Sequence, residues 1–341
     1  MKLLKTSFSA LLLSLFVIGL AAQTNAQNRR AVVKTYNEGL ELKKSGDYQQ
    51  AISTFNQTMA NAKELGEEGQ DIVSRSQQQL ADTYFKIAVS DYKALQNQQN
   101  IDNFDNAIAS FEKALEIANE YNSSQIKDRA TQIIPQLFYN KGVFGFKTKS
   151  YDMALDALNK AIERNSNYSN AYYQIALVKK NQKGVEQSEV IDAFKKALSV
   201  AESQNNSSVI EESNKQLGGI YLTKGHNLVE KQSDTQGGIE AYNTALNYTP
   251  ENEQVFFRLA EAHNKVQEWS QAAEYAQKGL DLETGGKTDK AKYYFALGNA
   301  YKGMGQKEQA CSAFSNAAYG SFKSSAEHEM EYQLKCDQAT N

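Results

Sequence analysis

One spacing of small and large apolar residues returns along the chain, and it constrains the fold more than any other feature. A small residue is followed four positions later by an aromatic residue or leucine, often with another small residue three positions beyond. These spacings place the side chains on one stripe of an α-helix, and small residues let a neighbouring helix approach closely. The copies are Ala51 and Phe55; Ala107, Phe111 and Ala114; Ala154, Leu158 and Ala161; Val190, Phe194 and Ala197; Gly238, Tyr242 and Ala245; Ala272, Ala276 and Gly279; and Ala310, Phe314 and Ala317. We therefore expect seven helices that each pack through this stripe.

A second pattern precedes these helices, and its last copy is the fullest. Tyr294, Leu297, Gly298 and Tyr301 stand upstream of Ala310 and Phe314. This resembles the tetratricopeptide repeat, W-x-x-L-G-x-x-Y and then A-x-x-x-F over about 34 residues, with Tyr in place of Trp. Partial copies are Leu80, Ala81 and Tyr84; Leu217, Gly218 and Tyr221; and Phe256, Leu259 and Ala260, with Pro250 where the fifth repeat should end. The resemblance extends over residues 28–320.

The resemblance implies an all-α, superhelical solenoid of about seven helix hairpins. We place the solenoid at residues 27–320 and a C-terminal capping helix and tail at 321–341. The first helices of the second and fifth repeats should be lengthened, because helical spacing continues before the polar loops at 96–103 and 231–236. Composition agrees with this class, since 2 Pro and 20 Gly are few for a β-rich chain of 341 residues.

Residues 1–26 have the pattern of a signal peptide. Lys2 and Lys5 precede an apolar stretch over 8–22, and the chain then turns polar. The apolar stretch is shorter than the roughly 20 residues that cross a bilayer, so we expect cleavage before Gln27, with cleavage at Ala22 as the alternative, rather than a retained span. The mature chain is then expected to be periplasmic or secreted, or associated with the envelope.

Adjacent aromatic residues in the first helices predict a binding surface. The first ring of each adjacent pair should lie in the core. The second ring is turned by about 100° around the helix, away from the second helix of the hairpin and toward the inner, concave wall of the solenoid. The predicted binding residues are Tyr36, Tyr139, Tyr173, Phe257 and Phe295, together with Asn299. Members of the resembled family commonly dock peptides or partner helices along this wall. The alternative is that these rings pack against the next repeat and meet no ligand.

Polar residues are expected on the same wall. They include Gln136, Lys147, Gln254, Glu261, Asn264, Lys265, Lys292, Asn299 and Lys302. Family members that clamp a terminal carboxylate use recurring Lys and Asn pairs. Here acidic and basic residues are mixed and the pairs do not recur, so such a clamp is not expected.

Cys311 and Cys336 would lie at one level of an antiparallel helix hairpin that turns at about 320–325. In an exported chain this favours a disulfide that fastens the cap, and the alternative is two buried thiols. No C-x-x-C spacing indicates redox catalysis.

Catalytic and nucleic-acid functions are not expected. His226, His263 and His328 are scattered, and we expect neither a catalytic site nor a metal or other cofactor. The lone Trp269 occupies the position of Tyr48 and Tyr151 in other repeats and is interpreted as structural. With 37 basic and 40 acidic residues, the chain has no excess of cations for a phosphate backbone.

The sequence therefore predicts a non-enzymatic scaffold or adaptor that binds a protein or peptide on its concave surface. The alternative is a glycan-binding module of envelope nutrient uptake, in which Tyr and Trp stack on sugars. An enzyme with its site in the inserted loops is a third hypothesis, which the absence of His and Cys from those loops opposes.

Overall fold

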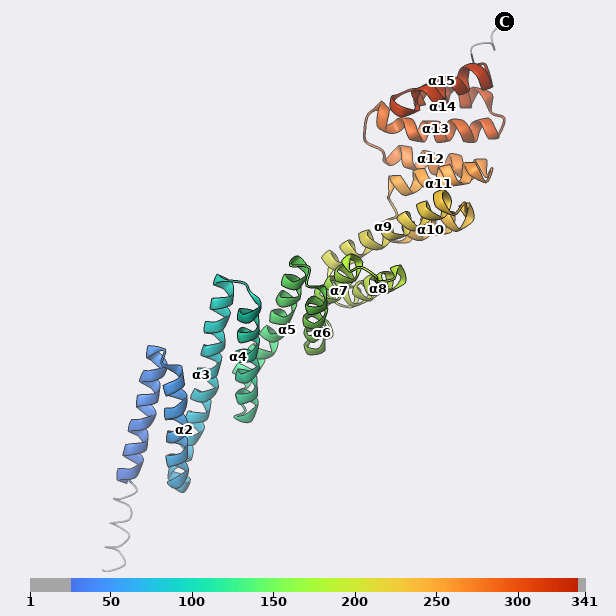
Figure 1. Ribbon diagram of the computed structural model, residues 1–341. Helices are drawn as coiled ribbons and strands as arrows, with labels where there is room; N and C mark the ends of the chain where they lie inside the picture. The colour runs from blue at the N-terminus through green and yellow to red at the C-terminus, as the bar shows by residue number, and fades with distance from the viewer. Residues whose placement is uncertain (1–25, 337–341) are drawn as a thin grey trace, which may run out of the picture. The chain divides into compact units, whose positions relative to one another are not determined.

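A computed structural model describes residues 26–336, and the predicted signal peptide lies outside these residues except for Ala26. The described chain is helical throughout and contains no β-strand. It divides into two compact units, with the boundary between Ala171 and Tyr172 in the first turn of a helix. Figure 1 shows the helices in chain order.

The first unit ends at Ala171 and consists of consecutive helix hairpins. A helix over residues 26–45 pairs with α2 (Tyr48–Glu64), and a short 3-10 turn, η1 (Gly66–Gly69), follows. The next pairs are α3 (Gln70–Asn97) with α4 (Ile101–Glu120), and α5 (Ser124–Lys147) with α6 (Tyr151–Arg164). Short connections make the helices of each pair antiparallel.

The second unit continues the same arrangement from Tyr172. Its pairs are α7 (Ser169–Asn181) with α8 (Gln187–Ser203), α9 (Ser207–Lys231) with α10 (Thr235–Tyr248), α11 (Glu253–Lys265) with α12 (Trp269–Leu282), and α13 (Lys287–Gly303) with α14 (Lys307–Ala317). The cap follows as η2 (Gly320–Phe322), α15 (Lys323–His328) and the π-helical η3 (Glu329–Leu334). The predicted class of stacked helix hairpins with a C-terminal cap is confirmed.

The repeated stripe forms the interior of both units. Every residue of the seven copies is buried, and Phe55, Phe194 and Phe314 are fully buried. A glycine in the first helix admits the large side chain of the second helix. A Cβ on Gly298 would lie 2.6 Å from Phe314 Cε1, and a Cβ on Gly39 would lie 2.7 Å from Phe55 Cε1. The paired helices are therefore so close that Gly39 and Gly298 leave no room for a side chain.

The lengthened first helices are also present, but one expected register is wrong. We expected Gly218 to be the repeat glycine of α9, yet a Cβ there would meet Thr249 at the end of α10. Gly225, two turns later, is the glycine that faces Tyr242. Because α9 spans 25 residues, Gly218 and Gly225 face two different levels of the same partner helix.

The turns within the hairpins use a left-handed residue. Gly46, Gly184 and Gly305 have positive φ angles of 93°, 80° and 73°. Lys149 and Gln267 adopt the same region with φ angles of 61° and 63° although they carry side chains. Such a residue ends the first helix and reverses the chain.

No helix in the described part of the chain combines the length and the apolar character that crossing a bilayer would require.

Candidate functional site

The predicted ring residues do not all point where we expected. Tyr36 lies 5.8 Å from Phe55, Tyr173 lies 5.8 Å from Phe194, and Phe295 lies 5.4 Å from Phe314, measured between ring centroids. Each of these rings therefore packs on the buried ring of its own second helix. The expectation that they turn away from that helix is wrong, because a large ring at this position still reaches the partner aromatic beside the small residue three positions later, which is Gly39, Ala176 or Gly298.

The other two predicted rings contact aromatic residues further along the chain. Tyr139 in α5 is half-buried and lies 5.1 Å from Tyr168, and burial raises the pKa of Tyr139. Phe257 in α11 is 9% exposed and packs edge-to-face on Tyr293 in α13, 5.7 Å away. The alternative, in which a ring packs against the next repeat, thus describes Phe257, whereas Tyr36 and Tyr173 contact their own hairpin.

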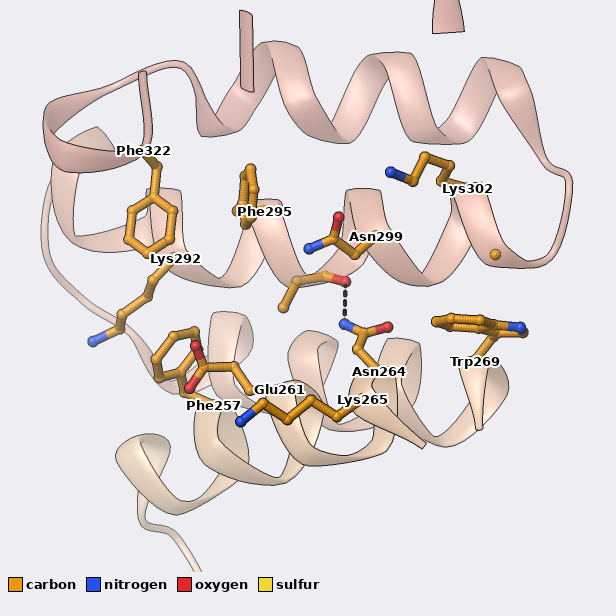
Figure 2. A pocket seen from close by; sticks show the side chains of 12 residues that line it. Phe257, Glu261, Asn264, Lys265, Trp269, Lys292, Phe295, Asn299, Lys302 and Phe322 are labelled. Atoms are coloured by element: carbon orange, nitrogen blue, oxygen red, sulfur yellow. Dashed lines mark hydrogen bonds between the residues drawn. The ribbon is translucent and has the colours of Figure 1, made fainter. Parts of the chain in front are cut away.

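Three of the six predicted binding residues nevertheless meet at one cavity in the second unit. Phe257, Phe295 and Asn299 line a cavity of about 580 Å³ between α11 and α13, the first helices of the last two hairpins. The polar residues expected beside them are there as well, namely Glu261, Asn264, Lys265, Lys292 and Lys302. Trp269, Ala296, Gly303 and Phe322 complete the lining (Figure 2). Tyr36, Tyr139 and Tyr173 do not line this cavity.

The cavity has aromatic side chains at both ends. Phe257, Phe295 and Phe322 gather at one end and Trp269 lies at the other, as Figure 2 shows. The Phe295 and Phe322 rings are 5.3 Å apart. The indole of Trp269 lies against Gly303, where a Cβ would overlap the ring. Aromatic surfaces at both ends suit apolar side chains of a ligand.

Two carboxamides lie between the aromatic ends. Asn264 Nδ2 donates a hydrogen bond of 3.0 Å to the carbonyl oxygen of Ala296 and so joins α11 to α13. Its Oδ1 is buried and has no hydrogen-bond partner among the described residues. Asn299 faces the cavity one turn beyond Phe295. A carboxamide both donates and accepts, which matches the hydrogen-bonding groups of a peptide main chain.

The lysines at the rim are already paired with carboxylates. Lys265 lies 3.0 Å from Glu230. Lys292 lies 3.4 Å from Glu283, and Lys302 lies 2.7 Å from Glu329. These pairs leave little uncompensated positive charge at the cavity.

Glu261 is the acidic residue of the lining. Burial raises the pKa of its carboxyl, and the Arg258 guanidinium, 2.8 Å away, acts in the opposite direction. The Glu261 side chain is 41% exposed, so its carboxylate stands at the edge of the cavity wall, paired with Arg258. In the described residues, no group of His, Cys, Asp and Glu is arranged to hold a metal ion. The lining thus offers apolar contact and hydrogen bonds, without an evident nucleophile beside a base.

Two aromatic residues of the cavity were not among the predicted peptide-binding residues. Trp269 was interpreted as structural, but it lines the cavity while it packs on Gly303. The glycine at the end of α13 is the signal that an indole needs space there. Phe322 comes from the cap, and no repeat pattern includes it.

The predicted cysteine pair lies at the cap. The Sγ atoms of Cys311 and Cys336 are 2.03 Å apart and their Cα atoms 5.8 Å apart. Cys311 belongs to α14, and Cys336 follows η3 by two positions. Formation of this bond in the cell stays a prediction.

Comparison with known proteins identifies the repeats. The family profile described as tetratricopeptide repeat matches residues 92–121, 135–168 and 291–319. The TPR repeat-containing protein MJ1428 of Methanocaldococcus jannaschii is 26% identical over 142 residues, which are 42% of this chain. The match covers 22% of that protein's own length.

Two solved structures illustrate the likeness. The TPR protein YrrB, described as having an unusual peptide-binding site, is 17% identical, with coverage of 61% of this chain and 97% of its own and a TM-score of 0.34. The TPR2AB domain of yeast Sti1, described as a complex with pHSP90, is 13% identical, with coverage of 88% of this chain and 92% of its own and a TM-score of 0.29. From its repeated sequence pattern, its consecutive helix hairpins and the profile matches, we conclude that this chain is a tetratricopeptide-repeat protein.

Proposed function

We propose that this protein is a non-enzymatic scaffold that binds a partner protein through a peptide segment held in the cavity between α11 and α13. One observation carries the proposal. Phe257 and Phe295 lie at one end of the cavity, Trp269 at the other, and the Asn299 carboxamide between them. An extended peptide would place apolar side chains at the aromatic ends and its amide groups beside Asn299.

A few buried aromatic contacts can supply most of the binding free energy at such a site. Buried aromatic anchors commonly carry most of the affinity of an interface. Helices held by tight packing lose little conformational entropy when a ligand binds, because the rings are already ordered by contacts such as Phe257 on Tyr293.

Binding to an array of acetylated, amidated peptides tests the proposal, followed by calorimetric titration of the best binder. Asn299→Ala should weaken binding by about tenfold, as expected for a central contact. Asn243→Ala, an exposed residue of α10 outside the lining, is the matched control and should bind as the parent protein does. Equal affinities for the two variants would reject the cavity as the peptide site.

The half-buried indole of Trp269 favours one second candidate, a glycan ligand that stacks a sugar face on the ring. Titration with a panel of neutral oligosaccharides separates the two. Saturable binding of a sugar, without binding of any arrayed peptide, would replace the peptide proposal.

We further propose that the protein acts in the periplasm or at the cell envelope, on the basis of the leader pattern in residues 1–26. N-terminal sequencing of the protein from cell fractions tests this. A mature chain that begins near Gln27 in the periplasmic fraction supports export, and an intact Met1 in the cytosol contradicts it.

A further inference from the structure

The cap supplies one end of the proposed binding cavity. Phe322 belongs to η2, which follows the last hairpin, and its ring packs on Phe295 at a centroid distance of 5.3 Å. Without Phe322 the aromatic end of the cavity would open beside Phe295 and Phe257. The repeats alone therefore do not complete this cavity.

The cap also holds a lining residue at the other end of α13. Glu329, in η3, pairs with Lys302 at 2.7 Å. The Glu329 side chain is 19% exposed, so the pair is partly shielded from water. Two positions of the cap, seven residues apart, thus act on the cavity wall.

Few apolar contacts hold the cap in place. Ala326 is the buried residue of α15, and neither η2 nor η3 contains one. Ala326, with Met330 and Leu334, covers the stripe of Ala310, Phe314 and Ala317 on α14. Residues 320–334 form one short helical run, and a run of this length is only marginally stable on its own in water. Its position therefore depends on these contacts and on how its far end is attached.

The cysteine pair supplies that attachment. Cys336 lies two positions beyond η3, and Cys311 lies in α14, 25 positions earlier. When the two sulfurs are bonded, the segment that carries Phe322 and Glu329 is closed into a loop, so its excursions from α14 are restricted.

We propose that the cap is a structural part of the ligand site and that the oxidation state of Cys311 and Cys336 sets the affinity of the cavity. Oxidised, the pair keeps Phe322 against Phe295. Reduction by a dithiol transfers two electrons and two protons to the disulfide, which becomes two thiols while the reductant becomes a cyclic disulfide. The cap then detaches more often, Phe322 leaves the cavity, and ligands bind more weakly. This inference rests on the proposed function.

The test uses the apolar dye 1-anilinonaphthalene-8-sulfonate as the probe. Trp269 is the sole tryptophan and lines the cavity, so energy transfer from its indole reports dye bound nearby. We expect the oxidised protein to bind with saturable transfer and dithiothreitol to weaken binding by about tenfold, as for loss of one buried aromatic contact. Reductant should have no effect on a Cys311→Ser, Cys336→Ser double variant, which should bind weakly throughout.

The Phe322→Ala variant separates the effect of the Phe322 ring on binding from the effect of the Cys311–Cys336 disulfide. This variant retains both cysteines, and we expect it to bind the dye weakly even when mass spectrometry shows the sulfurs bonded. Tyr332→Ala is the matched control, because Tyr332 is a cap ring that is 62% exposed and lies outside the lining. It should bind as the parent does and respond to reductant as the parent does. A Phe322→Ala variant with parental affinity would overturn the inference.

Hydrogen exchange shows whether the change stays in the cap. Reduction should speed exchange of the amides in residues 320–336 and leave those of α11 and α13 unchanged. Equal dye affinity before and after reduction would overturn the inference and leave the proposed function standing. Faster exchange throughout α13 would also overturn it, because the bond would then support the whole hairpin. No saturable binding by the oxidised protein would reject the cavity as a ligand site, and the inference with it.

Discussion

Replacement of Phe111 by alanine tests the packing of the repeats most sharply. Phe111 is 1% exposed, and its ring meets those of Phe85 and Tyr92 edge-to-face, with centroid distances of 5.5 and 6.4 Å. Removal of a buried ring costs about 3–5 kcal/mol, because the transfer free energy is lost and a cavity remains. The two ring contacts and the complete burial place this site in that range rather than below it.

Urea unfolding followed by circular dichroism at 222 nm measures the loss. Phe111→Leu keeps an apolar side chain in the same space and should cost about 1 kcal/mol, so it serves as the control. A loss below 1 kcal/mol for Phe111→Ala, or equal losses for both variants, would refute the assignment of this ring to a close-packed core. Because repeat proteins unfold locally, the transition should be fitted with allowance for an intermediate that retains the other hairpins.

Three further predictions follow from particular contacts. Gly298→Ala should destabilise the protein by about 1–3 kcal/mol in urea unfolding, since its Cβ would lie 2.6 Å from Phe314 Cε1; an unchanged midpoint would contradict the packing. Gln267→Gly should raise the free energy of unfolding by about 1 kcal/mol, because Gln267 has a φ of 63° and glycine enters that region without strain. A lower free energy of unfolding would show that contacts of the Gln267 side chain outweigh the relief of backbone strain. Burial, with a smaller effect of Tyr139, raises the pKa of Tyr168 to about 12. The neutral phenol therefore contributes fully to the free energy of unfolding below pH about 10, and this contribution is lost as the pH rises through about 12. Alkaline unfolding of Tyr168→Phe should therefore show a smaller loss over that window, and an identical loss would place Tyr168 in solvent.

Most of the fold follows from the repeated stripe. Phe111 and Phe314 are buried as predicted. The small-large-small spacing puts these side chains on the one face of the helix that packs against its neighbours. The cavity could be anticipated in part for the same reason. Phe257, Phe295 and Asn299 occupy equivalent or adjacent turns of successive first helices, so their meeting is a consequence of the stacking.

Other features depend on contacts that no local spacing records. Gly218 and Gly225 lie on one helix seven positions apart, and only the partner residues show that Gly225 faces Tyr242. Tyr293, Tyr294 and Phe295 are consecutive, and the fully buried ring is Tyr293, which reaches Gly279 of the preceding hairpin. The pattern predicted Tyr294 in that role because it describes contacts within a hairpin and not those between hairpins.

The cap was anticipated as a helix, but its effect on the cavity was not. Phe322 lies in a turn after the last repeat, where no periodic position predicts its direction. Its contact with Phe295 depends on how the cap folds back over α14. Trp269 was placed correctly at the start of a second helix, and its access to the cavity depends on the missing side chain at Gly303.

The nuclear magnetic resonance signal of one indole provides the most direct measurement of the central claim, that the cavity between α11 and α13 binds a peptide. Trp269 is the sole tryptophan, so a ¹⁵N-labelled sample has one indole N–H resonance, and it comes from the cavity lining. Titration with the best binder from the peptide array should move this resonance in a saturable way, with the dissociation constant measured by calorimetry. The same titration of Asn299→Ala should require about tenfold more peptide. A peptide that binds by calorimetry while the indole resonance stays still would place the binding site elsewhere and contradict the account.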